Sequence, residues 1–257
     1  MTRLIATVRA YFFGVLSTLY HGTRVTVCAW LKCSRREHIC WTTPRAWAGS
    51  MLWAAGVKVE VQGLEHLDPP RPAVLVSNHQ SWFDVFALAA KLPVDFRFVG
   101  KRELTRIPFF GSAWIACGNI AIDRRDRTSA IRSLAEAGKR LSDDKALVIM
   151  FPEGTRSRDG ELLPFKKGAF VLALQLGVPV IPVTIAGTRA IMPKGAWSVR
   201  PGTVQVRIGA PIDVSGLTEA DRDALLQTTR ERILAMREPR LPGDAPPELD
   251  AQTRKPL

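Results

Sequence analysis

The stretch "SNHQSWFD", residues 77–84, places a histidine and an aspartate five positions apart, directly after the apolar run "PAVLV". A neutral imidazole can take a proton from a hydroxyl, and a carboxylate can hold the other ring nitrogen in the right tautomer. Five residues on one continuous helix correspond to about 140° of rotation, which would point His79 and Asp84 to different faces. We therefore expect His79 in a loop and Asp84 near the start of a helix. Ser81 lies too close to the histidine for attack and is expected to be a loop or capping residue.

Other apolar runs also end on residues that could bind an anion. A histidine near a helix start is by itself more often structural, so these neighbours decide the interpretation. Open α/β sheets bind ligands beyond the carboxyl ends of their strands. Arginine offers a forked donor suited to phosphate, and glycine permits a tight turn. One base and several cations on one rim suit a substrate with a hydroxyl near a phosphate. The residues that follow the other strand-like runs are Lys101, Arg124, Glu153, Gly154 and Arg156.

Several common catalytic motifs are absent from the sequence. It contains no G-x-S-x-G, Walker A loop, H-E-x-x-H or G-x-G-x-x-G pattern. These absences argue against the commonest serine hydrolases, P-loop proteins, zinc proteases and dinucleotide-binding enzymes. We expect neither a bound metal nor a bound cofactor.

Five blocks in order resemble one known family. The blocks "NHQSWFD", "KRELTRIPFFG", "GNIAIDR", "FPEGTRS" and "VIPVTI" fall within residues 73–187. They are similar to the glycerolipid acyltransferase family, and most similar to the 1-acyl-sn-glycerol-3-phosphate acyltransferases, which make phosphatidic acid. The resemblance implies transfer of an acyl chain from coenzyme A or acyl carrier protein to the sn-2 hydroxyl of a lysophospholipid acceptor. Another lysolipid or glycerol-3-phosphate as acceptor stays open, as does a non-catalytic membrane lipid-binding module.

The resemblance also implies a role for each block. His79 and Asp84 match the catalytic H-x4-D pair, in which the histidine acts as general base without an acyl-enzyme. Pro182 lies in the block associated with the acyl chain. The residues that match the blocks for the acceptor phosphate are Lys101, Arg124, Glu153, Gly154 and Arg156.

Strand-like and helix-like segments alternate after residue 56, which is typical of an α/β fold. We expect a mostly parallel sheet flanked by helices over residues 57–238, and a disordered tail over 239–257, which are rich in proline and charge. The expected strands are 57–63, 73–77, 95–100, 119–123, 146–151, 178–187 and 203–209. The expected helices are 83–92, 108–117, 128–144, 168–177 and 219–237.

Residues 1–56 form a distinct basic and aromatic segment, with seven Lys or Arg, one acid and four of the seven tryptophans. Cations and indoles together suit the interface of an anionic membrane. We expect two helices lying on the membrane, the second over 44–56. No apolar stretch reaches the roughly 18–20 residues of a spanning helix. A single span at 10–31, or helices packed on the core with a solvated basic face, are the alternatives.

The net charge of +12 and the pI near 10.1 favour an anionic partner. The aromatic residues cluster in the apolar N-terminal segment, so a membrane surface is favoured over nucleic acid. We expect a peripheral or interfacial protein of the inner cell membrane, with its active site facing the cytoplasm. Reduced thiols are then expected, because the cytosol keeps cysteines reduced and no C-x-x-C pair occurs. The cysteines are Cys28, Cys33, Cys40 and Cys117.

Overall fold

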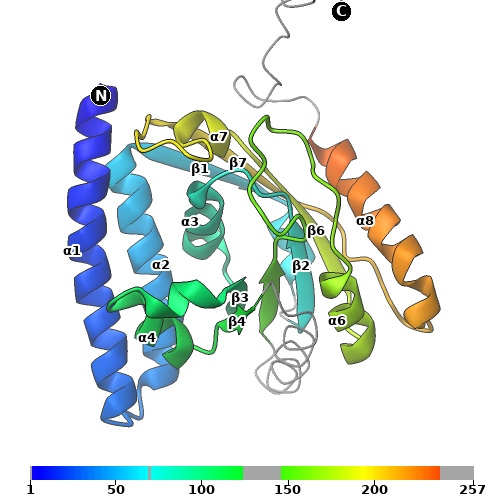
Figure 1. Cartoon of the computed structure of the whole chain (residues 1–257). Helices are drawn as coiled ribbons and strands as arrows, with labels where there is room; N and C mark the ends of the chain where they lie inside the picture. The colour runs from blue at the N-terminus through cyan, green and yellow to red at the C-terminus, as the bar shows by residue number, and fades with distance from the viewer. Residues whose placement is uncertain (1, 69–70, 124–145, 238–257) are drawn as a thin grey trace, which may run out of the picture.

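A twisted sheet with helices on both faces forms the centre of the molecule (Figure 1). The computed structural model describes residues 2–68, 71–123 and 146–237. Within these residues the sheet has seven strands in the order β1-β7-β6-β2-β5-β3-β4. The strands are β1 (Val57–Gln62), β2 (Ala73–Ser77), β3 (Phe96–Lys101), β4 (Ile120–Ile122), β5 (Leu147–Met150), β6 (Val180–Ala186) and β7 (Gly202–Ile208).

The pairing is parallel except between β6 and β7. The carboxyl ends of β2, β5, β3 and β4 therefore lie along the same edge of the sheet, which is where an open α/β sheet binds its ligands. The predicted α/β fold with a mostly parallel sheet flanked by helices is confirmed.

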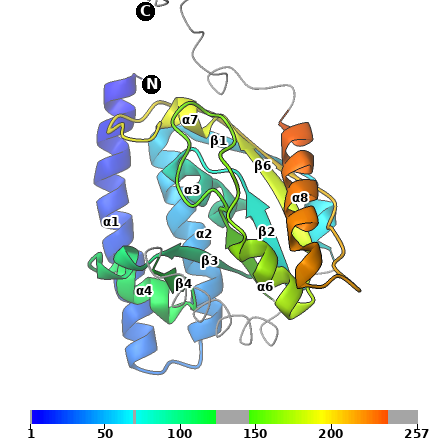
Figure 2. The same ribbon diagram turned by 45° about the vertical axis from the view of Figure 1, so that its right-hand side comes forward.

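Two apolar clusters cover the two faces of the sheet. On one face Leu75 and Ile149 pack with residues of α2 and α3, and on the other Val74 and Val148 pack with residues of α6 and α8. Alternate residues of β2 and β5 thus serve opposite cores, so both strands are buried throughout. Figure 2 shows the two helical layers with the sheet between them. The helices after the N-terminal pair are α3 (Trp82–Lys91), α4 (Phe110–Ala116), α6 (Gly168–Leu176), α7 (Thr188–Ile191) and α8 (Arg222–Met236). Short 3₁₀ turns are η1 (Leu64–Leu67), η2 (Arg102–Arg106) and η3 (Glu219–Asp221).

Two long antiparallel helices precede the sheet, α1 (Arg3–Trp30) and α2 (Arg36–Ala55) (Figure 1). The second helix begins earlier than the expected residue 44, since Pro44 lies inside it. Proline lacks the N–H that would bond the carbonyl four residues earlier, yet packing against α1 and α3 keeps the helix continuous. The helix ends at Gly56, whose positive φ of 69° terminates it. Among the described residues, no helix is both long and apolar enough to cross a membrane.

The expectation that all four cysteines are reduced is wrong for one pair. Cys40 of α2 and Cys117 at the end of α4 form a disulfide across 77 residues of sequence. No local spacing signals this bond, because only the packing of α4 against the pair of N-terminal helices brings the two thiols together. Cys28 and Cys33 are free.

Three expectations fall outside the described residues. They are the helix at 128–144, the tail at 239–257 and the position of Arg124.

Candidate active site

The loop that carries His79 is anchored where β2 ends. The buried Asn78 side chain donates to the carbonyl oxygen of Ile185 at 2.8 Å and accepts from the Ile185 N–H at 2.8 Å. The amide thus extends the β2–β6 ladder by one side chain. The position of His79 relative to the sheet is therefore fixed by its preceding neighbour, which the sequence reasoning did not single out.

His79 and Asp84 meet as the spacing predicts, with the histidine in a loop and the aspartate in the first turn of α3. His79 Nδ1 lies 2.7 Å from Asp84 Oδ2. Ser81 is the N-cap: its hydroxyl accepts from the Phe83 N–H and donates to the Met192 carbonyl. The expectation that Ser81 is a capping residue is confirmed.

The Asp84 carboxylate is fully buried and held by several donors. Its Oδ2 also accepts from the backbone N–H groups of Gln80 at 2.7 Å and Ser81 at 2.9 Å, and the residue is 0% exposed. These bonds, together with the positive end of the α3 dipole, stabilise a negative charge there. An ionised Asp84 fixes the His79 tautomer with the proton on Nδ1.

The other ring nitrogen of His79 is left for chemistry. Nε2 has no hydrogen-bond partner among the residues that the structure describes. The ring stacks on Phe151, with centroids 4.0 Å apart and planes 17° apart, and its side chain is 16% exposed. The imidazole is thus orientated from two sides while Nε2 can accept a proton, which is the arrangement of a general base.

The loop after β5 is bonded directly to the His79 loop. The Ser157 N–H donates to the His79 carbonyl at 2.8 Å, and the buried Gln80 amide donates to the Gly160 carbonyl at 3.2 Å. The predicted rim residues of "FPEGTRS" therefore lie beside the His79–Asp84 pair.

Glu153 joins these two loops from inside. Its Oε1 accepts from the His79 N–H at 2.7 Å and its Oε2 accepts from the Leu163 N–H at 3.0 Å. The residue is only 4% exposed. Burial raises the pKa of this carboxyl to about 7, although both hydrogen bonds oppose the shift. Both oxygens are engaged by backbone, so Glu153 positions His79 in this structure.

Gly154 adopts the left-handed conformation, with φ 69°. A side chain at this position would meet Lys166, since a Cβ atom would lie 2.8 Å from its Cε. The expected tight turn is present, and it brings Lys166, a cation that the sequence reasoning missed, against the loop.

Arg156 lies over the indole of Trp82, with Cζ 5.3 Å from the ring centroid. Burial lowers the pKa of its guanidinium, and the charge of Asp84 opposes that shift. Lys194 approaches from the loop after α7 and donates to the Arg156 carbonyl at 2.9 Å and to the Thr155 hydroxyl at 2.9 Å. The His79–Asp84 pair therefore has at least one cation close by, and no local signal in the sequence marked Lys194.

A groove of about 550 Å³ runs from Arg156 along α3 towards the N-terminal helices. Its wall is mainly apolar, with Arg156 as its charged residue. The wall residues include Trp82, Phe83 and Phe86 of α3, Tyr11 of α1 and Met51 of α2. We call this space the outer groove.

Two predicted residues lie away from this constellation. Lys101 is exposed at the end of β3, and β5 separates β3 from β2, so the strand axes are about 10 Å apart. Pro182 is buried in β6 on the face covered by α8, where Gly209 lies between it and Met236. The outer groove lies on the opposite face, so the structure does not bring Pro182 to it.

Within the described ranges, no group of three or more His, Cys, Asp or Glu side chains could hold a metal ion.

Comparison with known proteins places these residues in a family. The sequence profile described as Acyltransferase matches residues 58–186. The 1-acyl-sn-glycerol-3-phosphate acyltransferase of Haemophilus influenzae is 38% identical over 67% of this chain and 71% of that protein. The alpha form from Mus musculus is 40% identical over 70% of this chain and 64% of that protein.

The similarity to the plant relatives covers less of their length. The 1-acyl-sn-glycerol-3-phosphate acyltransferase of Limnanthes douglasii is 38% identical over 66% of this chain, and the match spans 60% of that protein.

A solved structure agrees over almost the whole chain. The crystal structure of the 1-acyl-sn-glycerophosphate (LPA) acyltransferase PlsC from Thermotoga maritima aligns with a TM-score of 0.77 at 29% identity. That alignment covers 92% of this chain and 96% of the other.

Replacing Glu153 with glutamine should change how stability depends on pH. The folded pKa of about 7 exceeds the ordinary 4.5, so the folded protein binds this proton more tightly than the unfolded chain. The protonated carboxyl therefore contributes about 3 kcal/mol to the free energy of unfolding below about pH 4.5. This contribution is lost as the pH rises through 7. Urea unfolding across this range should show the decline in the native protein and a flatter profile in Glu153→Gln. Glu60 is an exposed residue of β1, so Glu60→Gln is the control. A stability profile in Glu153→Gln that matches that of the native protein would contradict the raised pKa assigned to Glu153.

Proposed function

Since the chain belongs to the acyltransferase family, we propose that it transfers an acyl chain from a thioester to the sn-2 hydroxyl of 1-acyl-glycerol-3-phosphate, giving phosphatidic acid. The relatives from Haemophilus influenzae and Mus musculus, both 1-acyl-sn-glycerol-3-phosphate acyltransferases, support this acceptor. The observation that carries the proposal is the contact between His79 and Asp84 at 2.7 Å, with Nε2 facing away from it.

The reaction needs one base and no enzyme nucleophile. His79 Nε2 takes the proton of the acceptor hydroxyl, and the oxygen attacks the thioester carbonyl carbon. The tetrahedral intermediate collapses, the C–S bond breaks, and the leaving thiolate takes the proton back from His79. Asp84 holds the ring and stabilises the imidazolium between these steps. The Ser81 hydroxyl already makes two hydrogen bonds as the cap of α3, which supports a mechanism without an acyl-enzyme.

The acceptor phosphate is assigned to the cations around the loop after β5. Arg156 lies near Asp84 and presents a planar fork suited to two phosphate oxygens. Lys166 and Lys194 lie against the same loop. Holding the phosphate fixes the hydroxyl beside Nε2, and such positioning contributes several kcal/mol to lowering a barrier. Gly154 and Glu153 shape the loop in this assignment, while Lys101 and Arg124 remain candidates for the outer part of the phosphate site.

An acyl chain fits the outer groove better than the surroundings of Pro182. The groove begins at Arg156, beside the catalytic pair, and its wall is lined by aromatic and aliphatic side chains. We therefore assign acyl-chain contact to Trp82, Phe83 and Phe86. Pro182 is left with a structural role at the end of the β6–β7 ladder, where its carbonyl accepts from the Gly209 N–H.

The polarity of α1 supports binding to a membrane surface. Its inward side is formed by small buried residues such as Ala6, Ala10 and Gly14, beside which Thr7 bonds the backbone of Val199. Its outward side carries an exposed apolar stripe of Leu4, Val8, Phe12, Val15 and Leu19. A surface helix of a soluble protein has the reverse arrangement.

Two tryptophans extend this apolar side, since Trp30 is 80% exposed and Trp53 59%. We propose that the N-terminal pair lies in the headgroup region of the inner cell membrane, with the site facing the cytoplasm.

The acyl donor and the breadth of acceptors are the open parts of the proposal. Acyl carrier protein is acidic and coenzyme A carries phosphates, so the net charge of +12 suits either donor. Another lysolipid or glycerol-3-phosphate as acceptor, or a non-catalytic lipid-binding module, are the alternatives. An assay with lysophosphatidic acid and both donors in parallel separates these possibilities.

Removing the base or its partner should abolish most turnover. In His79→Ala and Asp84→Asn, the acyl-transfer rate should fall by about 10²–10⁴-fold, the usual contribution of a positioned general base. Labelled phosphatidic acid measures the rate, and circular dichroism checks the fold. His38→Ala, on the exposed side of α2, is the matched control and should keep its turnover. Near-native rates in both site variants would exclude the mechanism and leave the lipid-binding module as the better explanation.

Arg156→Ala should weaken acceptor binding through the phosphate. KM for lysophosphatidic acid should rise at least about tenfold, because a charge-assisted bond contributes about 1.5–3 kcal/mol. KM for the phosphate-free monoacylglycerol should not change. Arg232 is exposed on α8, so Arg232→Ala is the control and should keep the native KM. An unchanged KM for lysophosphatidic acid would remove Arg156 from the phosphate site.

The outward stripe of α1 should control vesicle binding. The triple change Val8→Ser, Phe12→Ser and Val15→Ser removes three exposed apolar side chains, each contributing about 1.5–3 kcal/mol when buried. Co-sedimentation with phosphatidylglycerol vesicles should fall at least about tenfold. Leu217→Ser, on an exposed residue before η3, should bind as the native protein does. Equal binding by the triple variant would show that another surface holds the membrane.

A further inference from the structure

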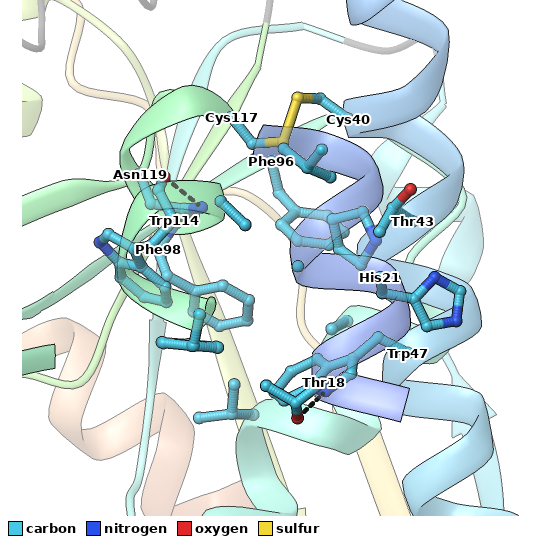
Figure 3. Close-up of a pocket in the computed structure, with 17 residues that line it drawn as sticks. Thr18, His21, Cys40, Thr43, Trp47, Phe96, Phe98, Trp114, Cys117 and Asn119 are labelled. Atoms are coloured by element: carbon cyan, nitrogen blue, oxygen red, sulfur yellow. Dashed lines mark hydrogen bonds between the residues drawn. A yellow bond between two sulfur atoms is a disulfide. The ribbon is translucent and has the colours of Figure 1, made fainter. Parts of the chain in front are cut away.

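A second cavity lies under α4, and the disulfide forms part of its wall. The cavity is lined by residues of α1, α2, α3, β3 and α4, including Cys40 and Cys117, and has a volume of about 80 Å³. Figure 3 shows the Cys40–Cys117 bond at one end of it, joining α2 to the end of α4. Its lining is mainly aliphatic and aromatic. We call this space the inner cavity.

A pair of aromatic rings separates the inner cavity from the outer groove. Trp47 lines the cavity and Phe86 lines the groove, and the rings meet edge to face with centroids 5.2 Å apart. Trp47 Nε1 donates to the Thr18 hydroxyl at 3.0 Å, which holds the indole in place. The inner cavity is therefore next to the groove assigned to an acyl chain. At about 80 Å³ it has room for roughly five water-sized groups such as methylenes.

The wall formed by α4 is attached to α2 at one end. The disulfide is made by Cys117, and the Arg36 guanidinium donates to the Ala116 carbonyl at 2.5 and 3.1 Å. At the other end, α4 follows Phe109, a bulky residue with φ 63°. Such a conformation is unfavourable for a bulky residue unless its surroundings enforce it.

The closed position of α4 also leaves polar atoms buried without partners. Trp114 Nε1 and Thr43 Oγ1 have no hydrogen-bond partner among the described residues, and these side chains are 8% and 5% exposed. Each buried polar group without a partner is destabilising. Strain at one end and unsatisfied groups within oppose this position of α4. The covalent bond to α2 and the packing of α4 on α1 offset them.

We propose that the Cys40–Cys117 disulfide is a redox switch that sets how much of an acyl chain the enzyme can hold. The inference rests on the proposed acyltransferase function. With the bond formed, α4 covers the inner cavity and its Phe110 ring packs against Trp47 with centroids 5.6 Å apart, which keeps the Trp47–Phe86 contact in place and disfavours long chains. After reduction, α4 moves from α2, Trp47 loses this support and the cavity extends the outer groove. A cellular dithiol supplies two electrons and two protons, so the S–S bond gives two cysteine thiols and the dithiol becomes a disulfide. A cytoplasm-facing disulfide is expected to cycle in this way.

The bond is accessible to a reductant, since Cys40 is partly exposed. The other two cysteines provide a matched control. Cys28 and Cys33 are free thiols at the turn between α1 and α2, and neither lines the inner cavity. Cys28→Ser with Cys33→Ser therefore removes two thiols and leaves the proposed switch intact.

The test compares the full chain oxidised with oxidised glutathione and reduced with a phosphine, each state verified by mass spectrometry after alkylation. Binding of the fluorescent fatty acid cis-parinaric acid reports the cavity without catalysis. It should tighten at least about fivefold on reduction, the lower end of usual coupling between two sites. The ratio of oleoyl to decanoyl transfer should rise by a similar factor. Cys40→Ser with Cys117→Ser should match the reduced protein in both buffers, while the control pair should respond as the native chain does.

Several outcomes would overturn the switch. Equal parinaric acid affinity in two verified redox states would do so, as would a Cys40–Cys117 pair that stays alkylatable after oxidation. Failure of the double serine variant to fold does not affect the comparison of native oxidised and reduced protein. If neither state transfers an acyl chain, the proposed function fails, and the binding measurement still decides whether reduction opens the cavity.

Discussion

One carboxylate oxygen, Asp84 Oδ2, accepts hydrogen bonds from the His79 ring and from two backbone N–H groups. The bonds to backbone close the turn that leads into α3, and the bond to the ring sets the tautomer that a base requires. The geometry of the loop and the geometry of the His79–Asp84 pair therefore depend on the same set of contacts. Because the group is fully buried, removing this side chain would take away the partner of the ring and the carboxylate half of the capping box together.

A second buried carboxylate, that of Glu153, connects this turn to the loop after β5. It accepts from the backbone of His79 on one side and from that of Leu163 on the other. Two strand ends that are adjacent in the sheet are thereby fixed to each other through side chains. This is how a rim built from separate loops can keep a base and a guanidinium in one place. Of the cations grouped by the resemblance, Arg156 is the one whose charged group is both described and close to Asp84.

The cationic side chains of the N-terminal helices make different kinds of contact. Arg45 is partly buried, lies over Trp41 at 3.6 Å and donates to the carbonyls of Leu92 and Val94, so it attaches α2 to the body of the protein. Arg9 packs over Trp53 at 4.7 Å. A count of cations and indoles thus overstates the part available to lipid headgroups. The outward apolar stripe of α1 is the stronger argument for a membrane surface, since water does not favour such a face.

Local patterns were sufficient for the α/β fold, for the ends of most strands, and for a loop histidine paired with an aspartate in the first helical turn. These features depend on hydrophobic periodicity and on capping, which act between residues close in sequence. The tertiary structure alone decided the Cys40–Cys117 bond, the engagement of Glu153 by backbone, the face on which Pro182 lies and the approach of Lys194. The roles of the site residues remain predictions. Each feature in that second group joins segments that are tens of residues or more apart in the chain, and their contact is set by how helices and strands pack, which no local spacing encodes.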